Sequence, residues 1–327
     1  MKAAWFEKFG NAGDVLKIGE LPKPHPQAGE VLVALASSGV NPSDVKKRAG
    51  AFPNLLDEGL VIPHSDGAGI IESVGEGVPE TRMGERVWVY QAQFARRFGT
   101  ASQYVCIDQQ RAVLLPFDVS FEVGACLGIP AMTAHRCIFA DGEVEGQTIL
   151  VTGGVGRVGY YAIQWARQAG AKVITTASNN NDADSCKQAG AFEVVNHRDE
   201  DWYRDVLKAN GGHKLDRVVE VEFGANLPQV LKLIRTGGTV ATYSSSREPQ
   251  PKMPFLEMMY LDLTLRMVIV YAMPETAKLQ AITDLDSYLR DGRLIHRVAH
   301  QVGLEEIAKA HELIEQGGFR GSVVVNI

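Results

Sequence analysis

A glycine-rich run at residues 153–159 holds the residues best suited to chemistry in this sequence. Gly154, Gly156 and Gly159 follow the apolar run 149–152 and open a segment with a helical pattern. Such glycines let a backbone turn approach a ligand closely, and amides at a helix start bind anionic phosphate groups. The spacing matches the fingerprint for a dinucleotide pyrophosphate, although a glycine-rich turn without a ligand would look the same in isolation.

The segment after the glycine run supports a bound dinucleotide. The β-rich run 172–177 completes a β-α-β unit of roughly thirty residues, which the fingerprint requires. Proteins that bind NAD usually carry Asp or Glu at the end of this strand, where this chain has Ser178. The missing carboxylate favours NADPH, while the nearby Asp182 and Asp184 keep NADH as the alternative. Candidate partners of a phosphate, or else solvated surface groups, are Arg157, His197 and Arg198.

The overall composition argues against several other classes of protein. With 45% hydrophobic and 22% charged residues, a chain of 327 residues suits two globular domains. The net charge of −6 and the pI near 5.8 disfavour a broad electrostatic grip on nucleic acid or anionic lipid. Four cysteines without a Cys-x-x-Cys pair indicate neither a disulfide scaffold nor a thiolate zinc site. The expected partner is a small molecule.

Neither a targeting signal nor a membrane span is expected from the sequence. Glu7 and Lys8 interrupt the first apolar residues before a signal peptide can form, so we expect a cytoplasmic protein. The apolar segment 263–273 contains Arg266 and is far shorter than the ~20 residues that a membrane helix needs. This segment is predicted to be a buried strand instead.

The elements that must position the glycine run alternate between strands and helices. From about residue 121 onward, this alternation predicts a parallel sheet with helices on both faces. A further strand at 263–271 is expected at the sheet edge, where unpaired backbone groups favour a second subunit, so we expect a homodimer. The other expected strands are 148–152, 172–177, 193–196, 217–220 and 238–242, and the expected helices are 156–170, 183–189, 200–209 and 225–234.

The first part of the chain has a different pattern. Short β-rich runs separated by Pro and Gly predict an antiparallel, barrel-like β domain up to about residue 120. A helix over 42–49 interrupts it, with Asn41 as part of its start signal. Later helices at 274–290 and 304–316 and a strand at 322–325 are expected to return to this domain. The expected strands of the first part are 15–20, 30–37, 68–74, 86–89 and 102–107.

Five motifs, in this order, resemble those of medium-chain dehydrogenases/reductases. They are Asn41-Pro42-Ser43-Asp44, Pro63-His64-Ser65-Asp66-Gly67-Ala68-Gly69, Val74-Gly75-Glu76-Gly77-Val78, Gly84-Glu85-Arg86-Val87 and Ile129-Pro130-Ala131-Met132-Thr133-Ala134. Over nearly its whole length, the chain resembles the zinc-independent quinone oxidoreductase branch, which includes the ζ-crystallins. The resemblance implies an α/β fold with a GroES-like β domain (1–122 and 272–327) and a Rossmann-type domain with a doubly wound parallel sheet (123–271).

The resemblance also bears on metal and on the acceptor. Zinc-dependent relatives carry Cys where this chain has Asn41, and Gly-His-Glu where it has His64-Ser65-Asp66. One His and one Asp do not make a zinc site, so no metal is expected. Without a metal, the acceptor must already be electrophilic, as a quinone or an α,β-unsaturated carbonyl is, and must take hydride directly from the nicotinamide.

Position by position, the resemblance implies a set of residues that contact NADPH. Asn41 and Thr133 would lie near the nicotinamide, and Val270 near its carboxamide. Thr133 could instead serve only its own helix, and Val270 only the core. Arg157 and Arg320 are further candidates for a cofactor phosphate. The glycine turn would contribute Gly153, Gly156, Val158 and Gly159, the ribose end Thr176, Ser178 and His197, and the loop over the cofactor Tyr243, Ser244 and Ser245.

Four residues are candidates for catalysis. Asn41 would position the acceptor and the nicotinamide, and Tyr90 would line the cleft. Many relatives carry Tyr where this chain has Lys46, whose cation could steady a developing oxyanion or could simply be solvated. His64 replaces a glycine and could donate a proton near neutral pH, or could be a packed loop histidine. The long segment 91–100 is expected to be either a lid that selects the substrate or a solvated loop.

Together these features predict an NADPH-dependent reductase of quinones or α,β-unsaturated carbonyls. Hydride would pass directly from the cofactor to the acceptor, without a metal. The alternative is an NADPH-binding protein without turnover, with a structural or regulatory role as in ζ-crystallins. Both would bind NADPH, but only the enzyme would oxidise it when offered 1,4-benzoquinone or an enone.

Overall fold

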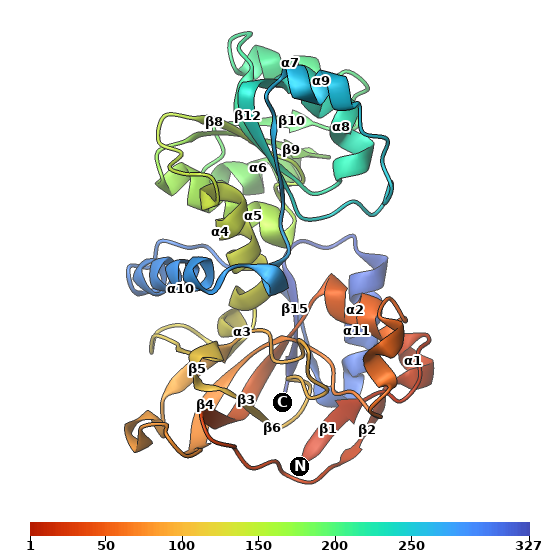
Figure 1. Ribbon diagram of the computed structural model, residues 1–327, viewed down its shortest axis with the longest axis vertical. Helices are drawn as coiled ribbons and strands as arrows, with labels where there is room; N and C mark the ends of the chain where they lie inside the picture. Colours follow the sequence, from red (N-terminus) through yellow and green to blue (C-terminus); the bar gives the residue numbers. More distant parts are fainter. The chain divides into compact units, whose positions relative to one another are not determined.

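The computed structural model describes residues 1–327, and the chain divides into two compact units. Unit 1 contains Met1–Ile129 together with Ile282–Ile327, and unit 2 contains Pro130–Ala281. Both ends of the chain therefore belong to unit 1 (Figure 1). The domain limits predicted after residues 122 and 271 stay a prediction.

A mostly antiparallel, seven-stranded sheet forms the centre of unit 1. Its strand order is β14-β15-β3-β4-β5-β7, and β6 pairs with β3. The long strand β3 pairs antiparallel with β4, β6 and β15, whereas β14 and β15 run parallel. This arrangement confirms the predicted GroES-like β domain. The strands are β3 (Glu30–Val40), β4 (Asp66–Val74), β5 (Arg86–Val89), β6 (Tyr104–Asp108), β7 (Ala112–Leu114), β14 (Val298–Gly303) and β15 (Ser322–Asn326).

Alternating apolar side chains build the core of unit 1. Val31 and Val33 on β3 are fully buried and pack with Ile71, Val87 and Val105 from neighbouring strands. Successive strand residues point to opposite faces, so this period of two places one apolar row against the core. A separate small sheet consists of β1 (Lys2–Trp5) and β2 (Lys17–Glu20). The helices are α1 (Ala12–Val15), α2 (Pro42–Arg48), α3 (Phe121–Gly124) and α11 (Ile307–Gln316).

Unit 2 is built on a six-stranded parallel sheet, as predicted. Its strand order is β10-β9-β8-β11-β12-β13. Counted from β8, this is the order 3-2-1-4-5-6 of doubly wound dinucleotide-binding folds, and the chain direction across the sheet reverses between β8 and β11. Ligands of such sheets bind at the carboxyl ends of the strands beside that point. The strands are β8 (Thr148–Val151), β9 (Lys172–Ala177), β10 (Glu193–Asn196), β11 (Leu215–Glu220), β12 (Ile234–Thr242) and β13 (Thr264–Met267).

Helices cover both faces of this sheet. The neighbours Ile149 and Leu150 on β8 are both fully buried, although they point to opposite faces, and the same holds for Val218 and Val219 on β11. Buried strands of this kind require cover on both sides, which explains their continuous apolar sequences. The helices are α4 (Met132–Phe139), α5 (Arg157–Gln168), α6 (Asn180–Gln188), α7 (Trp202–Ala209), α8 (Phe223–Leu233), α9 (Phe255–Tyr260) and α10 (Glu275–Arg290), the last of which continues into unit 1.

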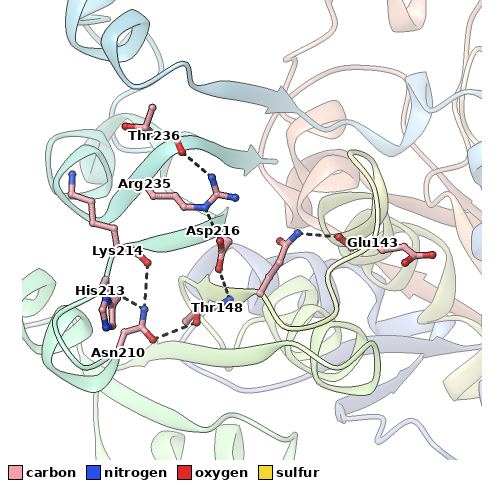
Figure 2. Close-up of polar contacts among 9 residues, drawn as sticks. Glu143, Thr148, Asn210, His213, Lys214, Asp216, Arg235 and Thr236 are labelled. Atoms are coloured by element: carbon pink, nitrogen blue, oxygen red, sulfur yellow. Dashed lines mark hydrogen bonds and ion pairs between the residues drawn. The ribbon is translucent and has the colours of Figure 1, made fainter.

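Side-chain bonds tie the amino-terminal edge of the sheet together (Figure 2). Asp216 on β11 accepts from the backbone N–H of Thr148 on β8 at 2.7 Å and from Arg235 Nε on β12 at 2.6 Å. Asn210 joins the same group by accepting from the Thr148 hydroxyl at 3.3 Å. The polar side chains at this edge thus bond one another and nearby backbone carbonyls.

Two predicted elements differ from the structure. The strand expected at 15–20 begins only at Lys17, because Val15 ends the helical turn α1 and is buried against Phe6. The strand expected at 263–271 is limited to β13, because its partner β12 ends at Thr242 and leaves no backbone groups to pair. Strand β13 does lie at the sheet edge, as predicted, but the expectation of a buried strand was wrong, because Thr264 and Met267 are exposed on this edge strand. None of the helices combines the length and the apolar character needed to cross a membrane.

Candidate functional site

The glycine turn joins β8 to α5 at the carboxyl-terminal edge of the sheet in unit 2. Gly153 has a φ of +63°, which favours glycine. A Cβ atom on Gly154 would lie 2.1 Å from Thr175 Oγ1, and one on Gly159 would lie 2.4 Å from the Gly153 carbonyl oxygen. Both glycines therefore let the turn and the helix pack tightly on the strands. Gly156 is exposed and precedes α5, whose first amides have no helical acceptors and suit a phosphate.

The turn is held by the end of strand β9, where a ribose is expected. Thr176 Oγ1 accepts from the Gly153 backbone N–H at 2.9 Å, and the Thr176 carbonyl accepts from the Gly154 N–H at 3.1 Å. Asp182 Oδ2 accepts from Asn179 Nδ2 at 2.8 Å and from Ser178 Oγ at 3.4 Å. The Asp182 carboxylate is thus bound within the first turn of α6. No other acid lies between the end of β9 and this turn.

Basic groups gather beyond the ends of β9 and β10. The backbone N–H of His197 donates to the carbonyl of Ala177 at 3.1 Å. Burial lowers the pKa of His197, and the positive charges of Arg198 and Arg247 lower it further. Arg247 was not among the predicted site residues, because only the folded sheet brings its loop near His197.

Glu220 is a second residue that the sequence analysis missed. It is fully buried at the end of β11, and burial raises its pKa. Its Oε1 accepts from Thr152 Oγ1 and Asn226 Nδ2, each at 2.9 Å, and from the Glu222 N–H at 2.6 Å. Thr152 Oγ1 in turn accepts from the Val221 N–H at 3.0 Å. This network ties the carboxyl ends of β8 and β11 at the point where the ligand is expected. Its only sequence signal is a carboxylate that ends an apolar strand.

The remaining predicted cofactor residues of unit 2 lie on several elements. Tyr243, Ser244 and Ser245 follow β12, and the Ser245 hydroxyl accepts from the Gly224 N–H at the start of α8 at 2.9 Å. Thr133 is buried within α4, and Val270 is buried in a 3₁₀ turn after β13. In the glycine turn, Arg157 and Val158 are half-buried at the start of α5. The contacts of these residues with a cofactor stay predictions.

In unit 1, Asn41 is held by Asp66. Asn41 precedes α2, and its Nδ2 donates to Asp66 Oδ2 at 2.9 Å. The same oxygen accepts from the Ile129 N–H at 2.8 Å. Burial raises the pKa of Asp66 to about 8. Asp66 was quoted above only for the family resemblance, and its distance of 25 positions from Asn41 gave no sign of the contact.

The other predicted residues of unit 1 are distributed differently. Lys46 is exposed on α2, whereas the adjacent Lys47 is buried and donates to the carbonyl and the side-chain oxygen of Gln93 at 2.7 and 2.8 Å. Tyr90 is buried, and its ring lies 5.6 Å from that of Trp88. Arg320 is exposed near the C-terminus. These positions leave the proposed roles of Lys46, Tyr90 and Arg320 as predictions.

His64 lies in a buried hydrogen-bonded chain. Its Nδ1 is 2.8 Å from Ser38 Oγ, and its Nε2 is 2.9 Å from His311 Nε2. Burial, aided by the charge of Lys47, lowers the pKa of His64 to about 3. A neutral imidazole with both nitrogens bonded inside the fold has no proton to offer a substrate at neutral pH. We therefore leave His64 out of the mechanism proposed below.

The segment 91–100 is largely fixed by hydrogen bonds. The Ala92 N–H donates to the Ser65 carbonyl at 2.9 Å, and the Thr100 N–H donates to the His64 carbonyl at 3.1 Å. Arg97 Nε donates to the Leu60 carbonyl at 3.0 Å. Both ends of the segment are buried, while Ala95 and Phe98 are exposed. The segment is therefore a packed loop, and its role in selecting a substrate stays a prediction.

No group of three or more His, Cys, Asp or Glu side chains suited to a metal ion is present in residues 1–327. All four cysteines are buried, and none forms a disulfide. The residue types that could hold a ligand are instead glycines, hydroxyls and basic groups at the carboxyl edge of unit 2. These types suit a phosphorylated organic molecule, and the tight turn at Gly154 and Gly159 fits a dinucleotide.

Comparisons with known proteins agree with this reading of the fold. Residues 27–117 match the family described as alcohol dehydrogenase GroES-like domain, and residues 158–285 match the family described as zinc-binding dehydrogenase. A quinone oxidoreductase from Rattus norvegicus is 31% identical over 99% of this chain and 97% of its own length. Quinone oxidoreductase 1 of Escherichia coli is 30% identical over 97% of both chains.

A solved structure extends this similarity to three dimensions. The Escherichia coli quinone oxidoreductase complexed with NADPH has a TM-score of 0.87 and 25% identity, and the match covers 100% of both chains. The sequence similarity and the structural similarity both run over almost the entire length. The chain therefore belongs to the quinone oxidoreductases of the medium-chain dehydrogenase/reductase superfamily and is an enzyme of this reductase type.

Proposed function

We propose that this enzyme uses NADPH to reduce quinones or α,β-unsaturated carbonyls by direct hydride transfer, without a metal. One observation carries the proposal: a quinone oxidoreductase solved with NADPH matches the whole chain, including the sheet that holds the glycine turn. The order of the strands in unit 2 is the order that binds dinucleotides, which supports the choice of ligand.

NADPH fits the residues at the carboxyl edge of unit 2. The pyrophosphate would lie on the first amides of α5, where Gly154 and Gly159 keep the turn close to the strands. The 2′-phosphate would lie among His197, Arg198 and Arg247, because the charges of both arginines act on His197. A phosphate with two negative charges would form charge-assisted hydrogen bonds with this group, whereas a neutral ribose hydroxyl would bind it only weakly. We therefore propose NADPH as the preferred cofactor.

When bound, the nicotinamide supplies the hydride. The chain must then position the acceptor and offer hydrogen-bond donors to the oxygen on which negative charge develops. We propose that Asn41 does this, with its amide held in place by Asp66. In this sequence the positions of the zinc ligands in zinc-dependent relatives hold Asn41 and His64-Ser65-Asp66, which supports a reaction without a metal.

We also propose a homodimer through the edge strand β13. This strand has one partner, β12, so its other side presents unpaired backbone groups. Its residues Thr264 and Met267 are exposed. Replacing Leu265, the central strand residue, by Pro should leave a monomer in sedimentation equilibrium, whereas a monomeric wild-type chain would overturn the dimer.

The decisive experiment measures oxidation of the nicotinamide with a panel of acceptors. Wild-type protein is mixed with NADPH or NADH and with 1,4-benzoquinone, an enone or an alcohol, in the presence and absence of EDTA. We expect NADPH oxidation with the quinone or the enone, unchanged by EDTA. Loss of activity with EDTA and its return with zinc would overturn the metal-free reaction. Binding of NADPH without turnover on any acceptor would favour a structural role instead.

A further inference from the structure

Asn41 and Asp66 form a buried polar pair in unit 1. Asn41 is 4% exposed and Asp66 is fully buried. They come from different elements, since Asn41 precedes α2 and Asp66 begins β4. Asn41 Nδ2 donates to Asp66 Oδ2 across 2.9 Å. The contact therefore fixes a loop residue against the central sheet of the unit.

The orientation of the Asn41 amide follows from its surroundings. In a capping box with Asp44, the backbone N–H of Asn41 donates to Asp44 Oδ2 at 2.8 Å, and the Asn41 side chain faces the Asp44 N–H. The Asp44 N–H also donates to the Asn41 backbone carbonyl, at 3.0 Å. The side-chain amide is oriented by Asp66 Oδ2, which accepts from Asn41 Nδ2 and from the Ile129 N–H. Of the two hydrogens on Nδ2, the contact with Asp66 uses one.

Asp66 is fixed more strongly than Asn41. Its Oδ2 also accepts from the Ile129 N–H at 2.8 Å, so this oxygen must be an acceptor whatever its charge. Its Oδ1 is buried without a hydrogen-bond partner and lies against Gly128, where a Cβ atom would come within 2.2 Å. The carboxyl group cannot rotate without losing the bond to Ile129. It is therefore a rigid acceptor for Asn41.

The charged groups around the pair come from α2. Asp44 raises the pKa of Asp66, and Lys47 lowers it, while burial raises it most. The carboxyl group of Asp66 accepts its hydrogen bonds from Asn41 and Ile129 and not from these two side chains. The pair therefore depends on the acceptor oxygen of Asp66 more than on an ion pair.

We propose that Asp66 is a positioning residue of the reaction, which holds the Asn41 amide so that one N–H of Nδ2 is directed to the ligand as a donor. A donor is what a developing oxyanion or a carbonyl requires, whereas an outward Oδ1 would repel it. This inference rests on the proposed function, because it takes Asn41 as the residue that meets the reacting groups. It adds that Asn41 acts only in the orientation set by Asp66.

The test is a double-mutant cycle with the full-length protein. The variants are Asp66→Val, Asn41→Ala and both together, with NADPH oxidation by 1,4-benzoquinone as the rate and NADPH fluorescence as the binding signal. We expect D66V to lower kcat tenfold or more, with the Kd of NADPH within about twofold of wild type. In the Asn41→Ala background, D66V should lower kcat no further, because the residue on which it acts is absent.

Conservative variants separate positioning from a structural role. In Asp66→Asn, the Ile129 N–H keeps an acceptor oxygen at the Oδ2 position, so D66N should retain at least a third of the wild-type kcat. Serine in Asp66→Ser is polar but too short to reach Asn41 Nδ2, so D66S should lose as much activity as D66V. This variant also provides the test if D66V does not fold. Asp216→Asn makes the same change in the network of Figure 2 and should leave kcat unaltered.

Three outcomes would overturn the inference. They are additive losses for D66V and Asn41→Ala, a D66N variant as slow as D66S, and a D66S variant with the wild-type kcat. A wild-type protein that turns over no acceptor with NADPH overturns the proposed function as well. Turnover by the wild type with additive losses overturns the inference alone.

Discussion

His64 and His311 stack inside unit 1, with ring centroids 5.1 Å apart and ring planes inclined by 25°. Their Nε2 atoms are 2.9 Å apart, so one ring donates and the other accepts, and each neutral imidazole carries one N–H. A third proton on the pair would either set two Nε2–H donors against each other or place a positive charge in a buried space. The pair is therefore stable only while it is uncharged.

This relationship predicts loss of stability in acid. Burial lowers the pKa of His64 to about 3 and that of His311 well below its usual value. Below pH 6.5 the two histidines bind protons in the unfolded chain but stay neutral in the folded one. The contribution of the pair to the free energy of unfolding is therefore full above pH 6.5 and decreases as the pH falls. Each histidine should lower the free energy of unfolding by up to about 1.4 kcal/mol for each pH unit below 6.5, until its own pKa in the folded protein is reached. Urea unfolding from pH 7 to pH 4 measures it.

A variant isolates the contribution of the pair. His311→Gln removes one titrating group and keeps a donor for His64, so its free energy of unfolding should fall less steeply between pH 6 and pH 4. His25→Gln, at an exposed position, serves as the control and should follow the wild type. Parallel curves for H311Q and the wild type would show that the pair does not set the acid limit.

The glycine turn yields a prediction about packing. In Gly154→Ala, the new Cβ atom would lie 2.1 Å from Thr175 Oγ1 and 2.9 Å from Ile163 Cδ1, so the turn must move off the strand. We expect a loss of about 1–3 kcal/mol in the free energy of unfolding and at least tenfold weaker NADPH binding. Gly13→Ala is the control, because its nearest contact is 3.7 Å away. Unchanged binding by G154A would refute the role of the turn.

Local patterns predicted much of unit 2. The limits of β9 and β10 agree with the expected 172–177 and 193–196, because apolar runs there end at turn residues. Helix α4 was expected around Thr133, but its limits were not predicted. Met132, Ala134 and Cys137 are among its many buried residues, so a simple polar stripe does not mark its ends.

The site was predictable only where its residues are close in sequence. The glycine turn is one continuous motif, and its strand and helix flank it. Asp66, Glu220 and Arg247 act through partners that are far away along the chain, and their residue types alone are common on surfaces. His311 was missed for the same reason, since it meets His64 across 247 positions.

Asp66 leads to a prediction with the opposite sign to that of the histidines. Burial raises its pKa from 3.8 to about 8, so the folded chain keeps a proton that the unfolded chain releases. The resulting stability is full below pH 3.8 and is lost as the pH rises towards 8, by up to about 1.4 kcal/mol per pH unit. Asp66→Asn cannot ionise, so its stability relative to wild type should increase between pH 5 and pH 8.5.

Thermal unfolding at a series of pH values checks this relative stability. Asp216→Asn is the control, since Asp216 lies in the Arg235 network at the amino-terminal edge of the sheet in unit 2, whereas Asp66 belongs to unit 1. A constant difference between D66N and wild type across this range would mean that Asp66 titrates as an ordinary acid in the folded protein.

The basic group beyond β9 and β10 predicts selectivity for the cofactor. In Arg247→Ala and Arg198→Ala, the charges near His197 that would meet a 2′-phosphate are removed. Each variant should raise the KM for NADPH about tenfold and leave the KM for NADH and both kcat values near those of wild type, because NADH lacks that phosphate. Steady-state kinetics with 1,4-benzoquinone give all four constants. Arg204→Ala, at an exposed position on α7, is the control. Equal increases in KM for both cofactors would place the phosphate elsewhere.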